Sequence, residues 1–163
     1  MGKDFIFSYG AGMNRSALRA WLESMGYDSS LVVGYSQAVL DGYDYVWNYY
    51  SSGRGGGTAN LEPKENSSVR GVLIEFEDSL LKAFDKKEGH PSFYSRGESR
   101  LPVLRLDDNQ VVFAWVYLAR PNRGDSRDIW PSREYKKIVI AAAVEANFPE
   151  EEVEKIKAWK TQS

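Results

Sequence analysis

The chain has 163 residues, of which 42% are hydrophobic and 13% aromatic, enough apolar material for one folded domain with its own core. It contains no cysteine and one histidine, His90, which excludes disulfide frameworks, thiolate metal sites, cysteine nucleophiles and sites built from several histidines. The 21 basic and 23 acidic side chains give a net charge of -2, without the basic excess that nucleic-acid binding requires.

The first predicted element is a strand over residues 5–7, which begins so close to Met1 that we expect no signal peptide. No apolar run in the sequence approaches the roughly 18 residues that span a bilayer. We therefore expect a single domain over residues 1–163, cytoplasmic and without a membrane or nucleic-acid partner.

A loop that contains two glycines follows this strand and leads into a helix. The helix is capped by Asn14 or Ser16, carries apolar residues at helical spacing from Leu18 to Met25, and ends at Gly26. Backbone N–H groups at a helix N-terminus can hold a carboxylate or a developing oxyanion. Glycines in such a turn also arise from tight bending alone, so both interpretations remain open for this loop.

Strands dominate the middle of the chain. Residues 31–50 are rich in Val and Tyr and predict two extended segments joined by a turn near Asp41-Gly42, and residues 58–61 and 69–76 predict two further strands. The glycine run before Thr58 is not a phosphate-binding loop, because that motif needs a lysine where Gly57 stands. It predicts a flexible hairpin connection.

A short helix is predicted after Asp78 or Ser79, with Gly89 as its stop, which makes Glu88 its last or next-to-last residue. The negative end of a helix dipole disfavours the charged form of a carboxylate and so raises its affinity for protons, which is one way in which a general base is tuned. The neighbouring Lys86 and Lys87 oppose this effect. The alternative for Glu88 is an ordinary solvated side chain.

The last part of the chain predicts a hairpin and two helices. The hairpin strands are residues 93–106 and 111–118, joined by a turn at 107–109, and a polar loop covers residues 121–130. Ser132 caps one helix, and a final helix begins near Pro149. Because strands and helices do not alternate regularly, we expect an α+β fold.

Several short motifs occur in a distinctive order. They are the Tyr9-Gly10-Ala11-Gly12-Met13 loop, Gly56-Gly57-Thr58-Ala59, Val69-Arg70-Gly71-Val72-Leu73, and Glu88-Gly89 with Tyr94 shortly after. This order, over nearly the whole chain, resembles the gamma-glutamyl cyclotransferase-like superfamily. The segment from Pro131 to Ile138 and the helix after it are similar to the gamma-glutamylcyclotransferase branch, which acts on glutathione-related dipeptides.

The resemblance implies a small mixed β-barrel with flanking helices, often assembled as a homodimer. It also implies a reaction that releases 5-oxoproline from a small-molecule gamma-glutamyl amine or dipeptide, in which the α-amine of the substrate attacks its own γ-carbonyl. No metal and no cofactor are needed. The catalytic acid/base of the family maps onto Glu88.

The resemblance further assigns substrate binding to the first loop, which in the family usually reads Tyr-Gly-Ser-Asn followed by Leu or Met. The Ser and Asn side chains are absent here, whereas the backbone N–H groups remain. Tyr94 and Tyr135 are implied to support Glu88 or the substrate. The residues that match the loop are Tyr9, Gly10, Ala11, Gly12 and Met13.

Two alternatives to this enzyme remain open on the sequence. The first is a non-catalytic protein of the same fold that binds or senses a small molecule. The second is a cyclotransferase that removes a gamma-glutamyl protecting group from a biosynthetic intermediate.

Overall fold

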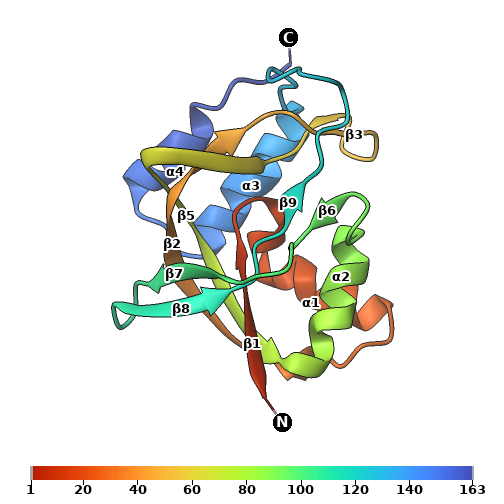
Figure 1. Ribbon diagram of the computed structural model, residues 1–163, viewed down its shortest axis with the longest axis vertical. Helices are drawn as coiled ribbons and strands as arrows, with labels where there is room; N and C mark the ends of the chain where they lie inside the picture. Colours follow the sequence, from red (N-terminus) through yellow and green to blue (C-terminus); the bar gives the residue numbers. More distant parts are fainter. Residues whose placement is uncertain (1, 163) are drawn as a thin grey trace.

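The computed structural model describes residues 2–162, and Figure 1 shows a curled β-sheet with helices packed around it. The strands are β1 (Lys3–Ser8), β2 (Val32–Val46), β3 (Tyr50–Ser51), β4 (Gly56–Gly57), β5 (Asn60–Glu77), β6 (Tyr94–Ser95), β7 (Leu101–Arg105), β8 (Gln110–Ala114) and β9 (Leu118–Ala119). The α-helices are α1 (Arg15–Ser24), α2 (Leu81–Glu88), α3 (Arg133–Glu145) and α4 (Glu150–Lys157). The 3₁₀ turns are η1 (Ala11–Met13), η2 (Ser29–Leu31) and η3 (Asp78–Leu80).

The main sheet has five strands in the order β1-β5-β2-β7-β8, and every pair in it is antiparallel. The expected α+β class with flanking helices is confirmed. The sheet is not closed into a true barrel, however. Its two edges meet through the single residue Trp115, whose carbonyl accepts from the Phe7 N–H and whose N–H donates to the Phe5 carbonyl, both at 2.9 Å.

The two longest strands differ from their prediction. The turn expected near Asp41-Gly42 is instead an irregular bulge in the pairing of β2 with β5, whose extra residues lie on β5, because Asp41 pairs with Ser68 and Tyr43 with Pro63 while Gly42 takes a φ of +80°. The two strands expected around residues 58–76 are likewise one continuous strand, β5. A glycine with positive φ marks a bulge as readily as a turn, so the sequence does not separate the two.

The predicted hairpin near residue 108 is confirmed, with shorter strands. Its turn has Asn109 at a φ of +56°, and β7 pairs with β8 on either side. The remainder of the two expected strands forms a separate small sheet, in which β6 pairs with β9. The stretch from Arg96 to Arg100, between β6 and β7, lies outside both sheets.

The predicted helix boundaries are confirmed at the ends that matter for the site. The Asn14 side chain accepts from the Ala17 N–H at 2.8 Å at the start of α1, and Ser132 accepts from the Tyr135 N–H at 3.1 Å at the start of α3. Helix α2 ends at Glu88, with Gly89 left-handed at a φ of +69°. These caps satisfy N–H groups that a helix start leaves without partners.

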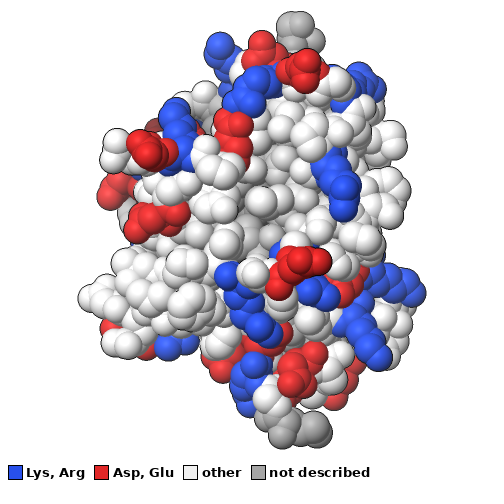
Figure 2. All heavy atoms as spheres, in the orientation of Figure 1, with Lys and Arg blue, Asp and Glu red and all other residues white. Residues whose placement is uncertain are grey.

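The buried side chains form one hydrophobic core between the sheet and the helices. Helix α3 contributes Tyr135, Val139 and two alanines to it and packs against the η1 turn. Acidic and basic side chains are mixed over the face in Figure 2, so charge is not segregated by sign there. Within residues 2–162, no helix is long and apolar enough to cross a membrane.

Candidate active site

A cavity of about 490 Å³ lies where the end of β1, the η1 turn, the β3–β4 hairpin and the end of α2 meet. We name it the tyrosine cavity, because it is lined by Tyr9, Tyr49, Tyr94, Tyr117 and Tyr135. Its size matches pockets that hold small molecules.

The structure brings most of the sequence-predicted site residues to this cavity. Those that line it are Tyr9, Gly10, Ala11, Gly12, Glu88, Tyr94 and Tyr135. Met13 does not reach the cavity: it is 1% exposed and belongs to the hydrophobic core. The apolar residue at the end of the loop therefore packs into the core and lies apart from the other residues predicted for the site.

Two of the tyrosines converge on the peptide groups of Ala59. The Ala59 N–H donates to the Tyr135 hydroxyl at 3.1 Å, and the Tyr94 hydroxyl donates to the Ala59 carbonyl at 3.0 Å. The Thr58 hydroxyl lies 2.8 Å from the Tyr94 hydroxyl. The Gly-Gly-Thr-Ala motif therefore holds both phenols in place at the wall of the cavity.

Tyr9 is fixed at both of its ends. Its hydroxyl donates to the Tyr117 carbonyl, and its own carbonyl accepts from the Tyr45 hydroxyl at 2.7 Å. Burial raises the pKa of Tyr9 well above its usual value, and the charge of Glu88 contributes to the rise. Tyr9 therefore stays neutral and orients the loop that follows it.

Glu88 is the last residue of α2, and its side chain is 26% exposed at the cavity wall. The Lys87 ammonium lies 3.5 Å from its carboxylate. After burial, the negative charge of Glu88 is among the causes that raise the pKa of Tyr94 and Tyr135 as well. The carboxylate is thus within electrostatic reach of the phenols that face the cavity.

The first loop is short of space around its two glycines. A Cβ at Gly10 would lie 2.8 Å from the Tyr135 hydroxyl, and one at Gly12 would lie 2.7 Å from the Ser8 hydroxyl. Burial raises the pKa of Tyr135, and its contacts with the backbone of Ala59 and Ala11 oppose the rise. The loop backbone therefore approaches the phenol directly, which a side chain at Gly10 would prevent.

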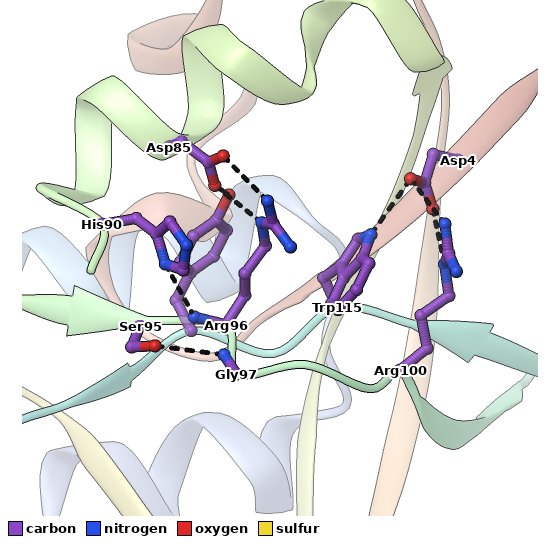
Figure 3. A network of polar contacts seen from close by, with 9 residues as sticks. Asp4, Asp85, His90, Ser95, Arg96, Gly97, Arg100 and Trp115 are labelled. Carbon is purple, nitrogen blue, oxygen red and sulfur yellow. Dashed lines mark hydrogen bonds and ion pairs between the residues drawn. The ribbon is translucent and has the colours of Figure 1, made fainter.

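A polar network braces the cavity wall from behind (Figure 3). Asp85 on α2 accepts two hydrogen bonds from Arg96, at 2.8 and 3.0 Å, and one from the Tyr117 hydroxyl at 2.7 Å. Burial raises the pKa of Asp85, but these hydrogen bonds outweigh it and hold the pKa below its usual value. The Nδ1 atom of His90 accepts from the backbone N–H of Arg96 at 3.3 Å, and His90 does not line the cavity.

The second half of the network ties the stretch between β6 and β7 to β1. Trp115 lies between Arg96 and Arg100, each guanidinium being 4.5 Å from the centroid of its ring (Figure 3). Two N–H groups of the Arg100 guanidinium and the indole N–H of Trp115 donate to the carboxylate of Asp4, each at 3.0 Å. Cation–π contacts and charge-assisted hydrogen bonds together stabilise the packing of this stretch against β1.

Sequence reasoning missed several residues of the site. Arg54 at the tip of the β3–β4 hairpin, Ser8 at the end of β1 and Tyr117 all line the cavity. Each comes from a segment predicted only as strand or turn. These residues come together only through the tertiary fold, so no local sequence pattern predicts that they line one cavity.

The sequence model of the family described as "Gamma-glutamyl cyclotransferase, AIG2-like" matches residues 6–137. A search of curated proteins gives no significant match.

Among solved structures, one called gamma-glutamyl cyclotransferase superposes with a TM-score of 0.83 at 22% identity, over 99% of this chain and 90% of its own. An uncharacterized protein from Homo sapiens has a TM-score of 0.79 at 22% identity, over 100% of this chain and 91% of its own. A yeast gamma-glutamyl cyclotransferase specific to glutathione has a TM-score of 0.60 at 10% identity, over 97% and 94%. At these identities, the superpositions show that the fold is shared.

Proposed function

The chain belongs to the gamma-glutamyl cyclotransferase, AIG2-like family, and we propose that it releases 5-oxoproline from a gamma-glutamyl amine or dipeptide without a cofactor. The observation that carries the proposal is that Glu88 and the Tyr9–Gly12 loop line one cavity. An acid/base group and a set of backbone amides facing the same space are the two parts that this chemistry needs.

In the proposed reaction, the α-ammonium of the substrate loses a proton to Glu88, and the free amine attacks the γ-carbonyl carbon. The new C–N bond closes a five-membered ring, and the bond from that carbon to the leaving nitrogen breaks. Glu88 passes a proton to the leaving amine. The attacking nitrogen gives up two protons and the departing amine gains two, so none is consumed.

Two physical effects account for the rate enhancement in this scheme. A positioned acid/base group is typically worth about 10² to 10⁴ in rate. Holding the amine near its own carbonyl in the reactive geometry supplies much of the remainder, because the attack is already intramolecular and only the chain conformation has to be restricted. Neither effect needs an enzyme nucleophile, which suits a sequence without cysteine.

Tyr135 acts as a neutral hydrogen-bond donor in this scheme, whereas the Tyr94 hydroxyl already donates to the Ala59 carbonyl and supports the cavity wall. Burial raises the pKa of Tyr94 and of Tyr135, so both phenols keep their protons at neutral pH. Tyr135 accepts from the Ala59 N–H, which leaves its own proton for a substrate oxygen. A donor fixed where negative charge develops stabilises the transition state more than the ground state.

The product identifies the reaction. Incubation of the protein with gamma-glutamyl-alanine and with gamma-glutamyl-ethylamine is expected to release 5-oxoproline and the free amine in equal amounts. Release of glutamate would indicate hydrolysis and contradict the proposal. Binding of both compounds in calorimetry without any turnover would favour the non-catalytic alternative instead.

A further inference from the structure

The tyrosine cavity has an excess of positive charge at its wall. Its charged lining residues, within the part of the chain that the structure describes, are Arg54, Lys86, Lys87 and Glu88. The gamma-glutamyl group itself is a zwitterion, since its α-ammonium and α-carboxylate cancel. A cavity with three cations and one carboxylate therefore suits a substrate that brings one further negative charge.

Within residues 2–162, neither Arg54 nor Lys86 has an acidic partner, and of these two Arg54 is the one that lies over an aromatic ring of the cavity wall. Lys87 pairs with Glu88, whereas within residues 2–162 no carboxylate lies within 4.0 Å of the Arg54 guanidinium. The guanidinium turns back over the cavity, 5.8 Å from the centroid of the Tyr135 ring, and its charge lowers the pKa that burial of Tyr135 raises. An unpaired guanidinium over a substrate cavity is a ready partner for a carboxylate.

The hairpin that carries Arg54 is anchored. The Gly57 N–H donates to the Trp130 carbonyl at 3.1 Å, and the Gln162 side chain donates to the Gly55 carbonyl at 3.0 Å. Two further bonds, from the Arg54 N–H to Ser51 and from the Gly55 N–H to Ser52, close the turn. The arginine is thus presented from a fixed loop, which reduces the entropy lost when it binds a ligand.

Arg54 comes from a different element than the groups proposed to bind the reacting end of the substrate. The γ-carbonyl must lie near Glu88 and the Tyr9–Gly12 loop, whereas Arg54 is an exposed residue at the hairpin tip. A leaving group that extends toward the hairpin would bring its own carboxylate beside this guanidinium. Resting on the proposed function, we propose that Arg54 is a specificity-determining residue that binds a carboxylate on the leaving group, so that gamma-glutamyl amino acids are preferred to gamma-glutamyl amines.

The test compares two substrates that differ mainly in that carboxylate, gamma-glutamyl-alanine and gamma-glutamyl-ethylamine. Arg54→Gln is expected to lower kcat/KM for the alanine compound about tenfold to hundredfold, the worth of a charge-assisted hydrogen bond, and to change the value for the ethylamine compound less than about twofold. Arg54→Lys is expected to fall between, because it keeps the charge without the paired donors. Arg19→Gln, an exposed arginine on α1, is the matched control and should leave both values unchanged.

Other outcomes overturn the assignment. Equal losses for the two compounds would mean that Arg54 binds a group common to both, such as the α-carboxylate. No loss for either would mean that Arg54 binds nothing in the substrate. If the unmodified protein turns over neither compound, the proposed function itself fails. Since Arg54 is exposed, an unchanged Tm of the variant is expected and verifies that the fold is intact.

Discussion

Arg96 donates two hydrogen bonds to Asp85, one turn of α2 before Glu88. Asp85 also accepts from the Tyr117 hydroxyl, and the Tyr117 carbonyl in turn accepts from the Tyr9 hydroxyl. A continuous set of polar contacts therefore links the helix that ends at the proposed acid/base with the loop proposed to bind substrate.

Replacing Asp85 tests this link. Asp85→Asn removes the charged acceptor from Arg96, so we expect the free energy of unfolding to fall by about 1 to 2 kcal/mol. We also expect kcat/KM to fall, because α2 and the Tyr9 loop lose their common brace. Chemical denaturation and steady-state kinetics measure the two effects. Asp125→Asn, in the exposed loop before α3, is the control, and equal effects of the two changes would refute the bracing role.

The environment of Asp4 predicts that the folded protein loses stability in acid. Burial raises its pKa, but hydrogen bonds from Arg100, the Phe5 N–H and Trp115 outweigh burial and lower the pKa below its ordinary value of 3.8. A carboxyl with a lowered pKa in the folded state binds its proton more weakly there than in the unfolded chain. Its contribution is therefore complete at neutral pH and is lost as the pH falls below about 4 toward the lower, folded-state pKa.

The measurement is the free energy of unfolding at pH 7 and at steps down to pH 3. Asp4→Asn is expected to be less stable than the wild type at pH 7 by about 2 kcal/mol and to vary less across the acid range. Asp44→Asn is the comparison, since that side chain is 41% exposed in its ion pair with Lys64. A wild-type profile unaltered by Asp4→Asn would show that the network around Trp115 contributes no acid-dependent stability.

Gly57 is required by close packing. A Cβ at this position would lie 1.7 Å from the Ile129 carbonyl oxygen, which belongs to backbone and cannot move aside cheaply. Gly57→Ala is expected to cost about 3 kcal/mol or more. At Gly53, in the same hairpin, the nearest atom is 4.0 Å away, so Gly53→Ala should change stability by less than about 0.5 kcal/mol. Similar Tm values for the two variants would contradict this packing.

Local features of this fold were predictable from the sequence, whereas features that depend on the pairing of distant segments were not. Helix ends at Asn14, Gly89 and Ser132 were predictable because capping and left-handed backbone are local properties. The bulge at Gly42 was not, because the same residue serves a turn or a bulge and the pairing with β5 decides between them. Arg54 was missed at the site for a similar reason: its role depends on where the β3–β4 hairpin lies.

A further prediction concerns Gly12 of the first loop, which stands where the family usually has Asn. Gly12→Ala would place a Cβ 2.7 Å from the Ser8 hydroxyl, which can rotate away, so a cost of about 1 kcal/mol is expected. Ser8→Ala removes that hydroxyl, and the double variant Ser8→Ala/Gly12→Ala should recover part of the loss in a double-mutant cycle. Strictly additive unfolding energies would show that the two residues do not contact each other.

The same pair tests whether the loop acts through its backbone. Gly12→Asn in the Ser8→Ala background restores the amide that the family usually carries at this position. If backbone N–H groups hold the substrate, kcat/KM should change by no more than a few fold. An increase of several orders of magnitude would show that the missing side chain is the binding group.

Glu88 is the group proposed to move the proton in this reaction. The most direct measurement is the rate of 5-oxoproline release from gamma-glutamyl-alanine by the wild type, by Glu88→Gln and by Glu98→Gln, an exposed control outside the cavity. Glutamine keeps the size of the side chain and removes its acid/base function, so kcat is expected to fall about 10²- to 10⁴-fold, with the Tm and the control variant's activity unchanged. Full activity of a folded Glu88→Gln variant would show that Glu88 is not the acid/base group.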